Sequence, residues 1–296
     1  MLKGSLVALV TPFNRQNGVD YAALEQLIEF HVREGSDGLV IAGTTGESAT
    51  LDKSEHIELI ERAVEFVAGR LPIIAGTGSN STAQTIELSV SVAASGIDAY
   101  LLVVPYYNKP GQEGMYRHFS AVADAVSKPV MLYNVPGRTS SDLQPETVAR
   151  LATHENIFGI KEATGDMARL KEIQALVDDG FMFYSGDDFT VLPFLEQGGH
   201  GVVTVSGNVV PAAMARLCAL AAAGDYDSAK ALDDTLQPLN KALFIESNPI
   251  PVKWAVAQMG LIEGYLRLPL TEYSEQYHEG MHKALKIAGV RLEHQQ

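Results

Sequence analysis

Lys161 stands where a run of apolar residues gives way to polar ones. Ile157-Phe158-Gly159-Ile160 precedes it, and Glu162-Ala163-Thr164-Gly165-Asp166 follows it. Short apolar runs of this kind are typical of buried strands, so this lysine is expected at a strand end, partly removed from water. Desolvation disfavours the ammonium form, and the free amine that results can attack a carbonyl carbon. The position therefore indicates imine chemistry, with an ordinary solvated lysine as the alternative.

The chain carries apolar, β-rich runs at regular intervals, and these would position such a lysine. Each run is followed by Gly, Thr, Asn or Asp and then by a segment of helical periodicity, which is the pattern of repeated βα units. The runs expected to be strands are 6–10, 38–42, 72–75, 99–104, 130–134, 157–161, 181–185 and 201–205. Near-continuous apolar strands indicate burial on both faces, as in parallel sheets. The expected fold is therefore an α/β protein of the (β/α)8 TIM barrel type.

The βα repetition stops after the eighth unit. We expect a barrel catalytic domain over 1–224 and a C-terminal extension of three helices over 225–296. Asn248-Pro249-Ile250-Pro251 predicts the start of one of these helices, with Asn248 as its cap and Pro251 in its first turn. Lys253 follows in an apolar setting and is the second candidate for the reactive amine. It ranks below Lys161 because it lies outside the barrel repeats.

Composition narrows the classes of function. With 36 acidic and 22 basic residues the formal charge is −14, which argues against nucleic acid as a partner. No apolar run approaches the roughly 18 residues of a membrane span, and Thr11-Pro12 interrupts the N-terminal run before any signal-peptide pattern. Cys218 is the only cysteine, which excludes an intrachain disulfide and a thiolate metal cluster. We expect a cytoplasmic protein that acts without a membrane or nucleic-acid partner.

Residues that directly follow the apolar runs are expected to converge, because the active site of such a barrel lies at the carboxyl ends of its strands. Hydroxyl and amide side chains dominate these segments. They are 43–48, 76–80, 105–108, 133–139, 161, 186–188 and 206–208. None of them contains a histidine, so neither a metal site nor metal-assisted catalysis is expected.

The reactive side chains in these segments fit a metal-free aldolase. Lys161 would supply the amine, Tyr133 and Tyr107 would carry protons, threonine hydroxyls would act as relays, and Arg138 would bind a carboxylate. Two of these residues also have a non-catalytic interpretation. Tyr133 could be an amphipathic aromatic at the barrel rim, and Arg138 could be a surface charge after a Pro-Gly turn.

One motif suggests a different chemistry. His278-Glu279-Gly280-Met281-His282 matches the H-E-x-x-H pattern of zinc metalloproteases. However, Tyr273, Tyr277, Met281 and Leu285 recur every four residues, which indicates a helix whose buried face is aromatic and aliphatic. We therefore interpret the motif as part of a structural helix and expect no zinc there.

Taken together, several motifs are far more specific than any one alone. They are Gly43-Thr44-Thr45-Gly46-Glu47, Gly76-Thr77-Gly78, Pro105-Tyr106-Tyr107, Tyr133-Asn134-Val135-Pro136-Gly137-Arg138-Thr139, Gly159-Ile160-Lys161-Glu162-Ala163 and Asn248-Pro249-Ile250-Pro251-Val252-Lys253. With them the chain resembles, essentially end to end, the dihydrodipicolinate synthase family within the pyruvate-dependent N-acetylneuraminate lyase superfamily. The resemblance implies condensation of pyruvate with L-aspartate 4-semialdehyde, the first committed step toward diaminopimelate and lysine, without a cofactor or metal.

The resemblance also implies a role for each matching catalytic residue. Lys161 would form the imine with pyruvate, which makes the methyl group acidic enough to yield an enamine that attacks the aldehyde. Tyr133 would move protons as general acid and base. Thr44 and Tyr107 would connect it to solvent as a hydroxyl relay, with Tyr107 supplied by a neighbouring subunit of a homotetramer.

Three further residues would bind substrate by the same resemblance. Thr45 would hold the carboxylate of pyruvate, and the backbone of Val203 would line the same pocket. Arg138 would bind the carboxylate of the semialdehyde, which favours this synthase over the sugar-acid lyases and aldolases of the superfamily. A rival of another class is a barrel that binds a keto acid without catalysis, since a fold alone does not fix a function.

The resemblance extends to an effector site for L-lysine at a subunit interface. The residues that would form it are Ser48, Ala49, His56, Asn80 and Tyr106. Gln84 stands where inhibited members often carry a glutamate that pairs with the ammonium of the ligand, and Lys53 adds a like charge. Loss of a charged partner costs roughly 1.5–3 kcal/mol, so we expect at most weak inhibition by lysine.

Overall fold

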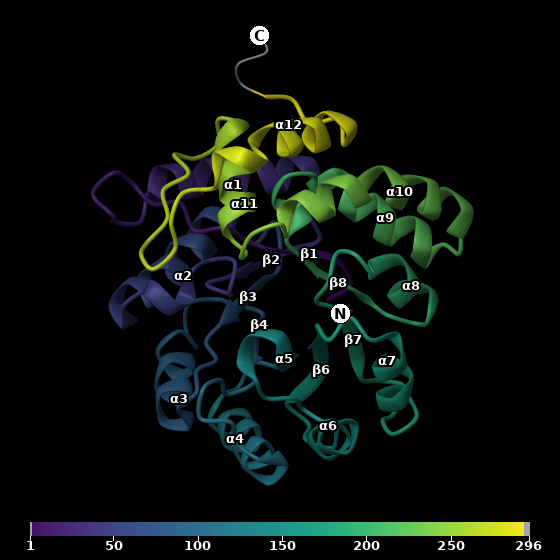
Figure 1. Ribbon diagram of the computed structural model, residues 1–296. Helices are drawn as coiled ribbons and strands as arrows, with labels where there is room; N and C mark the ends of the chain where they lie inside the picture. The colour runs from purple at the N-terminus through teal and green to yellow at the C-terminus, as the bar shows by residue number, and fades with distance from the viewer. Residues whose placement is uncertain (1, 293–296) are drawn as a thin grey trace.

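A closed barrel of eight parallel strands, ringed by helices, forms the centre of the molecule (Figure 1). The computed structural model describes residues 2–292. The strands are β1 (Gly4–Ala8), β2 (Gly38–Ile41), β3 (Ile73–Gly76), β4 (Ala99–Val103), β5 (Val130–Asn134), β6 (Ile157–Glu162), β7 (Met182–Ser185) and β8 (Gly201–Thr204). Each strand pairs with the next along the chain, and β8 closes the barrel on β1. The predicted (β/α)8 TIM barrel is confirmed.

The observed strand bounds agree with the predicted ones to within two residues, and those of β5 are identical. The largest shift is in β1, which begins at Gly4 and leaves Leu9 and Val10 outside the strand. The amide of Val10 donates to the side-chain oxygen of Asn208 at 3.0 Å and not to a neighbouring strand. An apolar run therefore continues past the point where backbone pairing ends, which sequence periodicity does not reveal.

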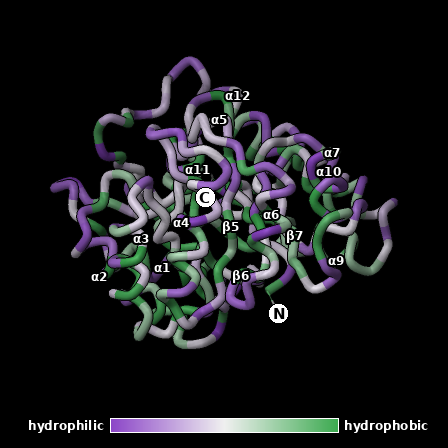
Figure 2. Tube along the Cα trace, turned by 90° about the horizontal axis from the view of Figure 1, so that it is seen from below, coloured by the Kyte–Doolittle hydropathy of each residue, from purple (hydrophilic) through white to green (hydrophobic). Residues whose placement is uncertain are grey.

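Helices cover the outside of the barrel. The longer ones are α1 (Tyr21–Glu34), α2 (Lys53–Val67), α3 (Thr82–Ser91), α4 (Gln112–Ala125), α6 (Pro145–Ala152), α7 (Met167–Gln174), α8 (Val191–Glu196) and α9 (Pro211–Ala222). Short turns of helix follow three strands, namely η1 (Ser48–Thr50), α5 (Pro136–Thr139) and η2 (Ser206–Asn208). Hydrophilic stretches gather along the periphery of the trace (Figure 2). No helix of residues 2–292 is long and apolar enough to cross a membrane.

Two apolar clusters fill the molecule, one between strands and helices and a smaller one inside the barrel. Side chains of a strand alternate between the two faces, so Tyr133 of β5 belongs to the interior cluster and Leu132 to the outer one. Tyr184 closes the interior at the other end through a 2.7 Å hydrogen bond from its hydroxyl to the Leu2 carbonyl. At the carboxyl ends of the strands the inward-facing residues line a cavity, so this end of the barrel is open to ligands.

Three helices follow the barrel, as predicted: α10 (Tyr226–Leu243), α11 (Ile250–Gln258) and, after the short turn η3 (Glu275–Tyr277), α12 (His278–Ile287). Helix α10 packs on α9, and α12 packs on α10. Pro251 lies in the first turn of α11 as predicted, but the predicted cap is wrong, because Pro249 holds that position. The division into domains at 224/225 stays a prediction.

A buried ion pair attaches this extension to the barrel. The Lys253 Nζ of α11 lies 2.7 Å from Glu47 Oε1, and the two side chains are 0% and 1% exposed. The same ammonium donates to the Tyr265 carbonyl at 2.5 Å, and the Arg267 amide donates to Glu47 Oε2 at 3.1 Å. Burial lowers the pKa of Lys253 to about 8, while the neighbouring Glu47 carboxylate opposes that shift. Lys253 is therefore still an ammonium at neutral pH.

We predict that Glu47→Gln lowers the free energy of unfolding by about 3–5 kcal/mol at pH 7, because it leaves Lys253 buried without its counter-charge. Urea denaturation followed by circular dichroism measures the loss. Asp234→Asn is the matched control, because it breaks the exposed pair of Lys230 and Asp234, and exposed pairs contribute about 0–1 kcal/mol. Equal losses for the two variants would contradict a special role for the buried pair.

Candidate active site

A cavity of about 230 Å³ opens at the carboxyl ends of the strands. It is lined by loops that follow several different strands and by the turn before α11. The lining residues are Ala8, Val40, Gly43, Thr44, Thr45, Leu101, Tyr133, Val135, Arg138, Lys161, Ala163, Thr164, Gly165, Gly186, Asp187, Val205, Phe244 and Asn248. Five residues singled out from the sequence, namely Thr44, Thr45, Tyr133, Arg138 and Lys161, thus surround one space.

Lys161 and Tyr133 form the centre of this cavity. They are partners in the register of β5 and β6, and each is 6% exposed. Lys161 Nζ lies 4.1 Å from the centroid of the Tyr133 ring. No carboxylate of the described residues forms an ion pair with Lys161. The amine is therefore held against an aromatic ring without a carboxylate partner, which leaves its nitrogen accessible to a carbonyl carbon in the cavity.

Lys253, the second candidate for the reactive amine, has a different environment. Its ammonium is bound by Glu47 and by the Tyr265 carbonyl, and it lies 4.2 Å from the centroid of the Phe13 ring. It does not line the cavity. These contacts make Lys253 a structural cation and leave Lys161 as the candidate nucleophile.

The residues next to this pair face outward and fix the two strands against each other. Asn134 Nδ2 donates to Glu162 Oε2 at 3.1 Å, and Glu162 Oε1 accepts the Thr164 amide at 2.7 Å. Asn134 also donates to Asp142 at 2.9 Å. Burial raises the pKa of Glu162 even though these hydrogen bonds favour its ionised form. Because side chains alternate, holding Asn134 opposite Glu162 also holds Tyr133 opposite Lys161.

Gly186 gives Lys161 room. A Cβ added at this glycine would lie 2.6 Å from the Ala163 Cβ and 3.0 Å from the Lys161 Cε. Both distances are shorter than ordinary van der Waals contact. The loop after β7 can therefore approach the lysine only because position 186 has no side chain.

The loop after β2 forms a candidate carboxylate site. The amides of Gly46, Glu47 and Ser48 donate to carbonyls of the same loop, whereas those of Thr44 and Thr45 donate to no group of the described chain. Thr45 is 2% exposed, and its Oγ1 accepts a hydrogen bond from Asn248 Nδ2 at 2.9 Å. Two free amides beside a hydroxyl make a suitable partner for a small carboxylate.

Arg138 lies at the rim of the cavity, in the short helix α5. Its Nη2 donates to the Asn248 carbonyl at 3.4 Å, and its side chain is otherwise exposed. The remaining guanidinium donors are therefore available to a second carboxylate entering from solvent.

Two predicted site residues do not line the cavity. Tyr107 is 89% exposed, has a φ of 74° and is not among the residues that line the cavity of its own chain. Val203 belongs to the barrel-interior cluster, and Val205, two residues further along, lines the cavity instead. No hydrogen bond joins Thr44 to Tyr133 within the described chain, so the relay stays a prediction.

The sequence analysis assigned no site role to two polar residues that hold the loops around the cavity, Asp188 and Asn248. Asp188 is completely buried, and its Oδ2 accepts the amides of Val205 at 2.8 Å and Ser206 at 3.0 Å, which shapes the turn after β8. Burial raises the pKa of this carboxyl. Asn248 lines the cavity and contacts Thr45. The only signal for Asn248 was its place before a proline-led helix, which we interpreted as capping.

The H-E-x-x-H motif lies on a structural helix. His278 stacks on Trp254 with ring centroids 4.6 Å apart, and its Nε2 contacts the Tyr273 carbonyl at 3.1 Å. Met281 and Leu285 are buried, as the periodicity predicted. Within residues 2–292 no group of three or more His, Cys, Asp or Glu side chains is arranged to hold a metal ion.

The predicted effector residues lie around the loops after β2, β3 and β4. His56 is buried and contacts the Gly76 carbonyl through Nε2 at 2.8 Å, and burial lowers its pKa. The Asn80 carbonyl accepts from Asn108 Nδ2 at 2.8 Å, which joins the loops after β3 and β4. Lys53 Nζ lies 2.5 Å from Glu87 Oε1, so its charge is already paired.

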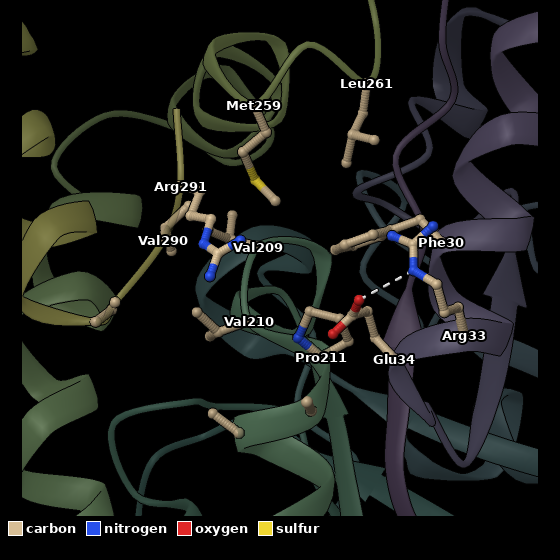
Figure 3. Close-up of a pocket in the computed structure, with 14 residues that line it drawn as sticks. Phe30, Arg33, Glu34, Val209, Val210, Pro211, Met259, Leu261, Val290 and Arg291 are labelled. Atoms are coloured by element: carbon tan, nitrogen blue, oxygen red, sulfur yellow. Dashed lines mark hydrogen bonds and ion pairs between the residues drawn. The ribbon is translucent and has the colours of Figure 1, made fainter. Parts of the chain in front are cut away.

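A wider hollow of about 520 Å³ lies elsewhere, between α1, α9, α11 and the segment after α12 (Figure 3). Phe30, Met259 and Leu261 line it, together with an ion pair of Arg33 and Glu34 at 3.2 Å. None of the residues that the sequence analysis singled out lies there. This hollow therefore contains no candidate catalytic residue.

Comparison with known proteins agrees with this geometry. The model of the dihydrodipicolinate synthetase family matches residues 1–288. A 4-hydroxy-tetrahydrodipicolinate synthase of Pseudomonas savastanoi pv. phaseolicola is 55% identical over 98% of this chain and 99% of its own length.

Solved structures are equally similar. The chloride-inhibited dihydrodipicolinate synthase of Acinetobacter baumannii, complexed with pyruvate, has a TM-score of 0.96 and 48% identity, covering 98% of this chain and all of its own. The enzyme of Cyanidioschyzon merolae with lysine bound has a TM-score of 0.95 and 40% identity, covering 97% of this chain and 98% of its own. On this evidence, the chain belongs to the dihydrodipicolinate synthetase family.

Proposed function

We propose that Lys161 carries the activity of this family, the condensation of pyruvate with L-aspartate 4-semialdehyde to 4-hydroxy-tetrahydrodipicolinate. That reaction is the first committed step of diaminopimelate and lysine biosynthesis. The single observation that supports the assignment best is the environment of Lys161. It is a buried lysine at a strand end, against Tyr133 and without a carboxylate partner in the described chain.

In the proposed reaction, Lys161 attacks the keto carbon of pyruvate, and water leaves to give an imine. The imine draws electrons from the methyl carbon, so a proton can leave and an enamine forms. The enamine carbon then bonds to the aldehyde carbon, and the aldehyde oxygen takes up a proton. Finally the amino group of the semialdehyde replaces Lys161 on the imine carbon, which closes the ring and frees the enzyme.

Tyr133 is the proposed proton carrier for these steps. The ring of Tyr133 lies against the lysine and Tyr133 lines the cavity, which supports a role for its hydroxyl in delivering and removing protons. Thr44 and Tyr107 would link it to solvent. The exposure of Tyr107 supports a contribution to the cavity of a neighbouring subunit, and the family resemblance supports a homotetramer.

The two carboxylates would bind at different residues of the cavity. Thr45, with the free amides of its loop, would hold the carboxylate of pyruvate, and the Val203 backbone would contribute below it. Arg138 would hold the carboxylate of the semialdehyde at the rim. Separate sites keep the reacting carbons facing each other, which converts the carbon–carbon bond formation into a positioned reaction.

L-lysine is the proposed effector, at Ser48, Ala49, His56, Asn80 and Tyr106. At position 84 the exposed side chain is a neutral amide, so the ammonium of the ligand would lack a charged partner there. Glu87 pairs with Lys53 and so moderates the expected repulsion between Lys53 and the ammonium of the ligand. It does not replace the carboxylate that is missing at position 84. We therefore infer a weak response to lysine.

The first prediction concerns the nucleophile. Borohydride in the presence of pyruvate should label the wild-type chain on Lys161, as mass spectrometry of the digested protein would show. Lys161→Ala should remove both the label and turnover in an assay coupled to the downstream reductase, because Lys161 is the only lysine among the described residues that line the cavity. A label that persists in Lys161→Ala would refute this assignment.

The second prediction concerns Arg138. Arg138→Ala should raise the KM for the semialdehyde by about tenfold or more and lower kcat, because a charge-assisted contact to the carboxylate is lost. Borohydride trapping of pyruvate should be as efficient as in the wild type. Arg150→Ala is the control, because it removes an exposed arginine that pairs with Glu113 on the outside of the barrel. Unchanged kinetics in Arg138→Ala would reject the role.

The third prediction concerns regulation. The wild-type enzyme should show no appreciable inhibition by lysine at sub-millimolar concentration, whereas Gln84→Glu should respond at lower lysine concentration than the wild type. Ala83→Glu adds the same charge one position away on α3 and should leave the response as it was. Strong sub-millimolar inhibition of the wild type would show that the missing carboxylate is not needed.

A further inference from the structure

Asn248 is the point where the C-terminal extension reaches the cavity. It lies in the turn between α10 and α11 and is 6% exposed. Its side-chain Nδ2 donates to Thr45 Oγ1 at 2.9 Å, and its backbone carbonyl accepts from Arg138 Nη2 at 3.4 Å. One residue of the extension thus contacts both side chains to which carboxylate binding is assigned.

The contact with Thr45 fixes what its hydroxyl can do. An amide NH₂ group only donates, so Thr45 Oγ1 uses a lone pair to accept it and keeps its own hydrogen free. Within the described chain the Thr45 hydroxyl donates to no protein group. That hydrogen is therefore available to an acceptor in the cavity, and a carboxylate is an acceptor only.

The opposite orientation of the amide would have the opposite effect. A side-chain oxygen facing Thr45 would take the hydroxyl hydrogen for itself and leave a keto acid facing lone pairs. Asn248 Oδ1 instead lies buried without a hydrogen-bond partner among the described residues. The orientation therefore leaves one polar atom unsatisfied while turning the hydroxyl into a donor.

Other contacts hold the backbone of the same loop. Glu47 is paired with Lys253, and the Thr11 hydroxyl donates to the Gly46 carbonyl at 2.7 Å. Both contacts remain when the side chain of Asn248 is changed. A substitution at position 248 should therefore act on the Thr45 hydroxyl more than on the path of the loop.

We propose that Asn248 is a positioning residue that keeps the Thr45 hydroxyl free to donate a hydrogen bond to the carboxylate of the keto acid. The inference rests on the proposed function and deepens it, because it assigns recognition of pyruvate partly to the extension. Asn248 acts through Thr45 and does not need to touch the reacting atoms. Arg138, the proposed site for the semialdehyde, contacts only the backbone carbonyl of Asn248, and side-chain substitutions retain that carbonyl.

The test is a double-mutant cycle with Asn248→Ala and Thr45→Val, read as KM for each substrate, kcat and borohydride trapping of pyruvate. Asn248→Ala should raise the KM for pyruvate by about tenfold, the effect of losing one hydrogen bond to a charged group, and change the KM for the semialdehyde by less than about twofold. In the Thr45→Val background the same substitution should have almost no further effect.

Two conservative variants sharpen the test. Asn248→Asp has nearly the same shape but presents only acceptors, so it should raise the KM for pyruvate at least as much as Asn248→Ala. Thr45→Ser keeps the hydroxyl and should respond to Asn248→Ala as the wild type does. Thermal unfolding of each variant identifies any that fails to fold, and Asn248→Asp then carries the comparison.

The outcomes separate this inference from the proposed function. A wild-type chain that neither traps pyruvate nor turns over would overturn the proposed function and this inference with it. If the wild type is active but the effects of Asn248→Ala and Thr45→Val multiply in the double variant, only the role of Asn248 would be overturned. The same holds if Asn248→Ala raises the KM values for both substrates equally.

Discussion

The buried ion pair of Glu47 and Lys253 is the interaction on which the rest of the site depends. Removing two charges from water is costly, and the cost is offset only when each charge meets its partner in good geometry. The loop after β2 can therefore take one position relative to α11, since any other leaves a charge alone in the interior. Thr45 lies two residues from one member of the pair and Asn248 five residues from the other. The extension thus belongs to the site as much as the barrel does.

The barrel contributes a second constraint through the alternation of its strands. Residues facing inward fill the interior, and the last inward residues of β5 and β6 are Tyr133 and Lys161. Their outward neighbours Asn134 and Glu162 are hydrogen-bonded, so the register that packs the outside also sets the spacing of the reactive groups. Rigid strands position the proposed nucleophile and proton carrier, while loops carry the residues proposed to bind carboxylates. This division suits a reaction in which the reacting groups of the enzyme stay fixed while substrates and product must enter and leave.

The sequence was sufficient to predict the barrel and the location of Lys161 at a strand end, because apolar runs and the polar residues after them are local signals. The position of Tyr133 in the same cavity follows from strand order alone. Contacts between distant segments could not be predicted in this way. Glu47 and Lys253 are 206 residues apart in the chain, and nothing near either residue indicates the other. Asn248 was misinterpreted because asparagine before a helix is a common cap, and a cap and a cavity contact use the same amide.

The close approach of the loop after β7 to Lys161, which Gly186 permits, matters for the proposed intermediates as well as for the resting enzyme. Before water leaves, the carbon joined to the lysine is tetrahedral and carries a hydroxyl, so this carbinolamine is bulkier than the flat imine that follows. A methyl group at position 186 would already crowd the lysine carbon next to the nitrogen. Any side chain at position 186 would therefore crowd the lysine in the resting enzyme and crowd the bulkier carbinolamine still more, so the glycine matters along the whole proposed reaction path.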